Sequence, residues 1–161
     1  MRRLVTIAAP LMVAAITPLL VGAAPCGSSG GARTAAPPSG PYTVGVIDTD
    51  TQGRVFTDTN FLVLYHDDAD NAATGSFDCV TGCLKLYHPL LTQPGATLTM
   101  PPGVVGTLGA VVRPDGVGDQ VTINGFPVYT FSGDQPGDTG GLTPSWHAVT
   151  APVRLPGLAG G

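Results

Sequence analysis

The apolar residues of the chain fall in short clusters that are separated by turn-forming residues. From Tyr42 onward each cluster is bounded by Gly, Pro, Asn or Asp. Short apolar clusters between such turn signals are typical of β-strands. The pattern therefore predicts strands near residues 44–47, 61–65, 104–112, 120–123, 126–131 and 146–149.

Helical patterning is weak throughout the chain. No window repeats apolar residues at the helical period for three turns, and residues 78–86 are the segment where a helix would be expected. Glu is absent and Lys85 is the only Lys, so strong helix formers are scarce. The predicted fold class is all-β, with little helix.

Composition narrows the choice of architecture and partner. The 161 residues suit one domain of ordinary size, and 23 Gly with 16 Pro indicate many turns. The formal net charge is -4, and only seven residues are Lys or Arg. Such a chain lacks the basic patch that nucleic-acid binding requires, so no nucleic-acid partner is expected.

The clusters form two related halves, residues 42–92 and 104–151. A displacement of 64 residues places Asn60 on Asn124, Tyr65 on Tyr129 and Asp70 on Asp134. An aromatic–His pair closes each half. Each half has about 50 residues, which is small for an independent core, so the two β-repeats are expected to pack together in one compact, sandwich- or barrel-like domain.

These motifs resemble the bacterial secreted repeat lipoproteins, a family described by a Tyr-x-aromatic-x-x-Asp motif. Tyr129, Phe131 and Asp134 carry the motif in the second half, and Trp146 follows. In the first half Tyr65 and Asp70 match, whereas the position of the second aromatic is occupied by Asp67. The family has no known biochemical function, so the resemblance implies membership and export but no chemistry.

The motif admits two interpretations. Residues two apart on a strand share a face, so Tyr129 and Phe131 would enter the core together, and Asp134 would begin a turn by bonding its own backbone. Alternatively, the motif residues form an exposed aromatic shelf for a planar or sugar-like ligand. The residues of that possible shelf are Tyr65, Asp70, Tyr129, Phe131, Asp134 and Trp146.

The first 25 residues have the features of a signal peptide. Two arginines follow Met1, an apolar run interrupted by two prolines comes next, and small residues end the segment. Cys26 then follows a sequence similar to a lipobox, although Pro25 stands where Gly, Ala or Ser is usual. We expect acylation of Cys26 and attachment to the outer face of the bacterial membrane. The alternative is cleavage after Ala23 and release of a soluble protein.

The remaining segments have simple predicted roles. Residues 26–41 are rich in Gly, Pro and Ser and are expected to form a disordered tether. Residues 42–151 form the two-repeat domain, and residues 152–161 form a loose tail.

Two cysteines fall inside the domain. Cys79 and Cys83 are four residues apart, and export would place them in an oxidising compartment, which predicts a local disulfide. The alternative is a redox or copper site in which Cys79 and Cys83 are joined by His88 or His66, because soft thiolates and imidazoles bind copper.

Other chemistry finds little support in the sequence. The segment that begins at Asp48 opens like a calcium loop, but Thr59 stands where an EF-hand needs a bidentate Glu. No motif of a known nucleophile, zinc protease or phosphate loop occurs. We assign no catalytic residue and no cofactor.

The expected function is therefore non-enzymatic: an envelope-anchored lipoprotein with a binding or envelope-maintenance role. The alternative function is extracytoplasmic redox or copper handling.

Overall fold

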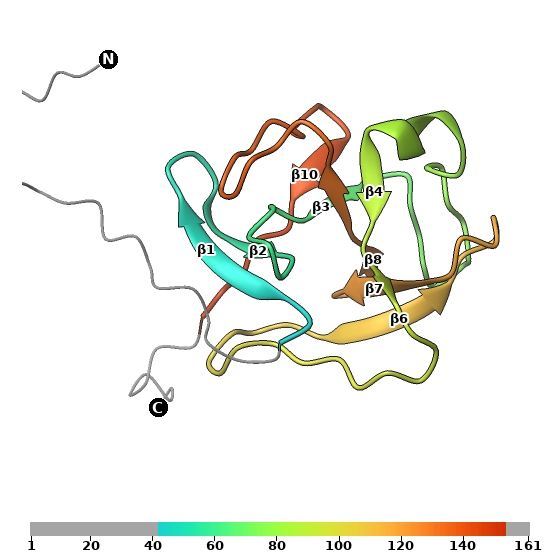
Figure 1. Ribbon diagram of the computed structural model, residues 1–161, viewed down its shortest axis with the longest axis horizontal. Coiled ribbons are helices and arrows are strands. Elements are labelled where there is room, and N and C mark those ends of the chain that lie inside the picture. The colour runs from blue at the N-terminus through green and yellow to red at the C-terminus, as the bar shows by residue number, and fades with distance from the viewer. Residues whose placement is uncertain (1–41, 154–161) are drawn as a thin grey trace, which may run out of the picture. The chain divides into compact units, whose positions relative to one another are not determined.

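The computed structural model describes residues 42–153, which form an all-β domain (Figure 1). The expected signal peptide, Cys26 and the tether lie outside the described residues, as does the end of the tail. The strands of the first repeat are β1 (Gly45–Thr49), β2 (Gly53–Thr57), β3 (Tyr65–Asp67), β4 (Tyr87–Pro89) and β5 (Leu91–Thr92). Those of the second repeat are β6 (Leu108–Val112), β7 (Asp119–Ile123), β8 (Phe126–Pro127), β9 (Tyr129–Phe131) and β10 (Trp146–Ala148).

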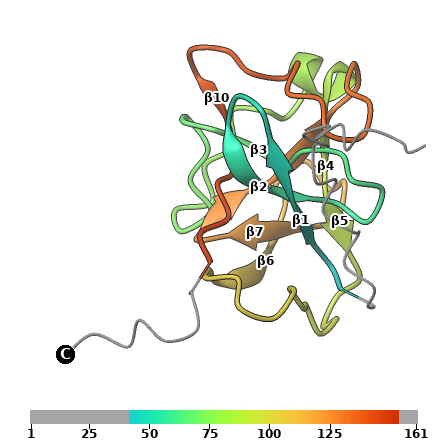
Figure 2. The ribbon, with the colours of Figure 1, turned by 90° about the vertical axis from the view of Figure 1, so that its left-hand side faces the viewer.

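Three antiparallel sheets make up the domain. The β1–β2 hairpin forms one, the strands β10-β3-β9-β4 form the second in that order, and β5-β7-β6 form the third, with β8 also paired to β7. None of these sheets closes into a barrel within the described domain. Figure 2 shows β10 and β3 toward the top of the domain and β6 and β7 toward the bottom. The all-β prediction is confirmed.

The four-stranded sheet relates the two repeats by an approximate two-fold. Exchanging β3 with β9 and β4 with β10 leaves its strand order unchanged. The register agrees: Ala148 lies opposite Tyr65, and Pro89 lies opposite Tyr129 in the same way. Each closing strand therefore pairs with the tyrosine strand of the other repeat, and not with that of its own.

Backbone hydrogen bonds outside the four-stranded sheet form triangles that also link each repeat to the closing segment of the other. The Leu64 amide donates to the carbonyl of Phe56 (2.9 Å), Phe56 donates to Val149 (2.8 Å), and Val149 donates to Leu64 (2.8 Å). A second triangle joins Val121, Val128 and Leu90 at 2.8–3.1 Å. Val149 of the second repeat thus completes the first triangle, and Leu90 of the first repeat completes the second.

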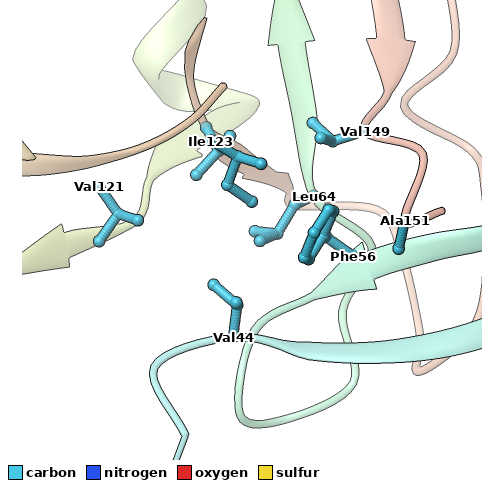
Figure 3. Packing of buried hydrophobic residues seen from close by; sticks show 8 residues of the cluster. Val44, Phe56, Leu64, Val121, Ile123, Val149 and Ala151 are labelled. Atoms are coloured by element: carbon cyan, nitrogen blue, oxygen red, sulfur yellow. The ribbon is translucent and has the colours of Figure 1, made fainter. Parts of the chain in front are cut away.

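One shared core fills the space between the repeats. Phe56 and Leu64 of the first repeat pack with Val121, Ile123 and Val149 of the second, and all five are buried. Figure 3 shows these side chains converging from separate ribbons. A second cluster surrounds Tyr65 and Tyr129. Neither repeat keeps a closed core of its own, as the length of each repeat led us to expect.

Local signals explain the turns and the little helix. The expected helical segment contains one 3-10 helix, η1 (Gly82–Lys85). At the equivalent turns of the two repeats, Phe61 and Asn124 have positive φ values of 65° and 52°. Because Phe61 adopts this turn conformation, the predicted strand at residues 61–65 begins only at Tyr65.

The described domain extends slightly beyond the predicted boundary at residue 151. The Val105 amide donates to the carbonyl of Pro152 (2.8 Å), and Val153 forms a β-bridge with Val104. Residues 152 and 153 therefore belong to the folded domain and not to the tail.

Candidate functional site

The two motif tyrosines meet at the centre of the four-stranded sheet. Tyr65 on β3 and Tyr129 on β9 are register partners, and both are fully buried. Opposite residues of an antiparallel pair share a face, so both phenol rings enter the same core cluster. Strand pairing thus brings together two residues that are 64 positions apart in the chain.

Each tyrosine bonds the motif aspartate of the other repeat. The Tyr65 hydroxyl donates to Asp134 Oδ2, and the Tyr129 hydroxyl donates to Asp70 Oδ2, both at 2.5 Å. Each Asp follows its own Tyr by five residues, yet it contacts the Tyr of the other copy. The motif is therefore a reciprocal clasp between the repeats, and we call these four residues the Tyr–Asp clasp.

The second oxygen of each aspartate holds a loop. Asp70 Oδ1 accepts a hydrogen bond from the Asp78 amide (2.7 Å), and Asp134 Oδ1 accepts one from the Gly140 amide (2.8 Å). The prediction that Asp134 bonds its own neighbouring backbone is wrong in detail, because its partner lies six residues further along. Charge-assisted bonds of this kind fix both the loop and the carboxylate.

Burial and the neighbouring carboxylates keep both phenols protonated. Burial raises the pKa of Tyr65 and of Tyr129, and the hydrogen bonds to Asp134 and Asp70 raise them further. The tyrosines therefore act as hydrogen-bond donors in the clasp at neutral pH.

Arg113 completes the clasp on the side of Tyr129. Its side chain is fully buried and donates to Asp115 Oδ2, to Gln120 Oε1 (2.5 Å), to the Tyr129 hydroxyl (3.1 Å) and to the carbonyl of Cys79 (2.5 Å). Burial alone would lower the pKa of Arg113, but its bonds to Asp115 and Tyr129 raise it above the ordinary value. A buried cation thus connects the β6–β7 hairpin to the loop that carries the disulfide.

The Tyr65 half of the clasp is completed by backbone groups. The Gly141 amide donates to the Tyr65 hydroxyl at 3.3 Å, and the carbonyl of Asp138 lies 3.5 Å from the same oxygen. The two halves therefore share the Tyr–Asp bond but differ in what surrounds it.

The closing aromatics of the two repeats stack on each other. The Tyr87 and Trp146 rings are 3.6 Å apart and nearly parallel, at 9°. Phe131, which is half-buried, lies 5.2 Å from Tyr87. Because Tyr65, Tyr129 and Trp146 are buried, these rings do not form a shelf that is open to solvent.

Asp67 occupies the position that an aromatic ring fills in the second repeat. It lies opposite Trp146, as Phe131 lies opposite Tyr87, and it is only 5% exposed. Asp67 therefore does not face solvent at the end of β3. Burial raises the pKa of Asp67, and the nearby carboxylates of Asp70, Asp78 and Asp68 add to this rise.

The two domain cysteines are joined, as the sequence predicted. The Cys79–Cys83 disulfide joins the segment before η1 to the second residue of η1, and Cys79 is buried. The possible copper set is not assembled: His88 is exposed on β4, whereas His66 contacts Phe126 and His147. Among residues 42–153, no three His, Cys, Asp or Glu side chains lie close enough to hold a metal ion.

A histidine pair on the edge of the sheet had no sequence signal. His66 and His147 are register partners with ring centres 5.6 Å apart, and His147 Nε2 lies 3.0 Å from Asp68 Oδ2. The Nδ1 atom of His66 is buried and has no hydrogen-bond partner, and burial lowers the pKa of this ring. The sequence could not pair these histidines, because only the register of β3 with β10 brings them together.

A depression of about 520 Å³ lies between the β1–β2 hairpin and residues 150–153. Its two charged side chains, Asp48 and Arg54, bond each other at 2.8 Å on the surface. Neither residue is part of the clasp.

The membrane anchor expected at Cys26 lies outside the described residues. In the part of the chain that the structure describes, no helix is long and apolar enough to span a bilayer.

Comparison of the chain with protein-family models, with curated proteins and with solved structures found no match. Membership of the repeat lipoprotein family therefore stays a prediction from the motifs.

Proposed function

We propose that the protein is a non-enzymatic lipoprotein of the bacterial envelope, in which a two-repeat β-domain stands off the membrane on a short tether and serves a binding or envelope-maintenance role. The N-terminal sequence features support the envelope location, and the burial of the polar motif residues supports a non-enzymatic role.

One observation carries the non-enzymatic part of the proposal. The side chains that could have carried acid–base chemistry at the motif are buried and bonded to one another: Tyr65 to Asp134, and Tyr129 to Asp70 and Arg113. A general acid or base must reach a substrate proton. The clasp residues instead stabilise the contact between the repeats, which supports a structural role for the motif.

The envelope location is supported by two features of the sequence and one of the structure. Residues 1–25 have the pattern of a signal peptide, and Cys26 follows a sequence similar to a lipobox. The disulfide between Cys79 and Cys83 suits an oxidising compartment. Acylation of Cys26 would leave the domain as a peripheral module on the outer face of the membrane.

Fractionation of cells that express the full chain tests this proposal. The unchanged protein and a Ser28→Ala control should sediment with membranes, whereas Cys26→Ala should appear in the soluble fraction. Metabolic labelling with a fatty acid should mark the first two proteins and not the third. A Cys26→Ala protein that still sediments with membranes would contradict the lipid anchor.

The second candidate function is extracytoplasmic redox or copper handling. The disulfide favours it, because Cys83 is partly exposed and a reductant could reach it, whereas Cys79 is buried. Copper analysis of protein purified with and without reductant tests this candidate. One equivalent of copper in the reduced protein, lost in Cys83→Ser and kept in a Lys85→Ala control, would favour it over the binding role.

A further inference from the structure

Many of the contacts between the two repeats are reciprocal. The strands β4 and β5 of the first repeat pair with β9 and β7 of the second, and β10 of the second repeat pairs with β3 of the first. The backbone triangles and the Tyr–Asp clasp follow the same rule. The surface of one repeat is therefore complementary to the other repeat, wherever that other repeat comes from.

Loop contacts extend the reciprocity. The Ser132 amide donates to the carbonyl of Leu86 (2.7 Å), and the Asp68 amide donates to the carbonyl of Ser145 (3.0 Å). These two bonds occupy equivalent positions in the two halves. The closing segment of each repeat thus leaves its own repeat and completes the other one.

A short exposed connector joins the two repeats, and its conformation determines whether they can pack on each other within one chain. Residues 93–97, which we call the connector, are all exposed. The connector reverses the chain in a turn, in which the Ala96 amide donates to the carbonyl of Gln93 (3.0 Å) and Gly95 has a φ of 73°. Positive φ at the third position of a Pro-Gly turn is the conformation that glycine permits and other residues resist.

We propose that the protein pairs with a second copy of itself by exchanging repeats: the connector extends, and the first repeat of each chain packs on the second repeat of the other. Such a dimer keeps every contact between the repeats that the single chain makes and replaces only the connector turn. Exchange of identical elements between protomers is a low-cost route to a dimer when a hinge can open.

Interchain cross-linking tests this proposal. His88 and Thr130 are opposite each other across β4 and β9, so one residue comes from each repeat. Opposite residues of antiparallel strands are about 4.5–5.5 Å apart at Cα, within the range of a disulfide. Full-length chains that carry Cys26→Ser would be prepared with either His88→Cys or Thr130→Cys, mixed in urea, refolded and oxidised.

The expected product is a disulfide-linked heterodimer of the two chains. The matched control mixes His88→Cys with Val112→Cys, which is also exposed but lies opposite Asp119 and not His88. This control measures random collision between exposed thiols. A cross-linked yield for the first mixture that does not exceed the control would overturn the proposal.

Opening the connector should favour exchange. Proline fixes φ near -65° and lacks an amide hydrogen, so Gly95→Pro with Ala96→Pro removes both features of the turn. In this background we expect the cross-linked yield to rise about tenfold, because the closed turn is the conformation that proline excludes. Light scattering should then report a mass twice that of one chain. A folded monomer with a cross-linked yield at the collision level would contradict the proposal.

Discussion

At the scale of single residues, the domain depends on buried polar groups that are paired across the repeats. Asp70 and Asp134 each accept one hydrogen bond from a tyrosine of the other repeat, and each also accepts from loop amides of its own repeat, two for Asp70 and one for Asp134. A buried carboxylate is tolerable when its oxygens are bonded, and removing a partner exposes the full cost of its desolvation. Removing any one of the four clasp side chains should therefore lower stability by more than the loss of a single hydrogen bond, because its buried partner is left unpaired.

Arg113 should be among the most sensitive positions of the domain. Arg113→Met would leave Asp115 and the Tyr129–Asp70 pair without their buried cation. We expect the free energy of unfolding in urea to fall by about 3–5 kcal/mol, as when one partner of a buried ion pair is removed. Arg54→Met is the matched control, because the Arg54–Asp48 pair is exposed and should contribute about 0–1 kcal/mol. Equal effects of the two substitutions would contradict a structural role for Arg113.

Asp67 should make stability depend on pH in a defined direction. Burial raises the pKa of Asp67, so the folded protein binds this proton more tightly than the unfolded chain. The free energy of unfolding therefore falls as pH rises from the unfolded pKa of about 3.9 through the raised folded pKa. Asp67→Asn removes this loss and can still accept the Ala69 amide hydrogen bond that Asp67 Oδ1 accepts.

We expect Asp67→Asn to be more stable than the unchanged protein at pH 7 and to lose that advantage near pH 3. Urea unfolding at the two pH values measures the difference. An advantage that is the same at both pH values, or that is larger in acid, would contradict the assigned cause.

At the scale of elements, short strands are held by partners from the other half of the chain. The tyrosine strands β3 and β9 have three residues each, and β5 has two. Strands this short are not stable as isolated hairpins. Pairing across the repeats and the loops packed on the strands hold them in place, and glycines occur where those loops approach the rings.

Gly141 is a position where the loop backbone approaches two aromatic side chains closely. A Cβ at Gly141 would lie 2.8 Å from Phe131 Cβ and 2.9 Å from the Tyr65 ring, whereas one at Gly82 would meet nothing within 4 Å. Gly141→Ala should therefore lower the free energy of unfolding by about 1–3 kcal/mol through overpacking. Gly82→Ala should change it by no more than about 0.5 kcal/mol in the same thermal or urea titration. A neutral Gly141→Ala would show that the loop can move away from the core without loss.

The sequence predicted the elements that carry a local signal. Strands β1, β7 and β10 fall within or beside predicted clusters, and the one short helix lies in the expected segment. Strand β2 was missed because only Val55 and Phe56 are apolar there, and β4 and β5 were missed because Pro89 interrupts them. Their strand character comes from pairing with β9 and β7, which single-chain periodicity cannot report.

The sequence motif identified the residues of the clasp but not which tyrosine bonds which aspartate. The spacing of Tyr129 and Asp134 identified the right residues and suggested a local role for Asp134. The true partner, Tyr65, lies 69 residues away, and only the sheet order brings it near. No sequence motif pointed to Arg113, because its role depends on burial against Gln120, Tyr129 and Cys79, which only the fold brings about.

At the scale of the whole molecule, two incomplete repeats form one folding unit. The shared core takes residues from both repeats, and the Tyr87–Trp146 stack joins the closing strands. Loss of either half would leave the other with unpaired strands and an exposed core. The repeats should therefore fold and unfold together.

Unfolding should be a single cooperative transition. Trp146 is the only Trp in the chain, and its ring stacks on Tyr87 of the first repeat, so its fluorescence reports the contact between the repeats. Far-UV circular dichroism reports the strands of the whole domain. We expect the two signals to give the same urea midpoint, as in a two-state transition. Separate midpoints would mean that one repeat remains folded without the other.

The reciprocal clasp is tested most directly by two double-mutant cycles on Tyr65. One cycle combines Tyr65→Phe with Asp134→Asn in the other repeat, and the second combines Tyr65→Phe with Asp70→Asn in the same repeat. Asn keeps an oxygen for the loop amide and removes the carboxylate that faces a tyrosine. Directly bonded residues show interaction energies of about 0.5–3 kcal/mol, and independent ones stay within about 0.5 kcal/mol. Coupling of Tyr65 to Asp134 and not to Asp70 is the predicted result, and coupling to Asp70 instead would contradict the exchange between repeats.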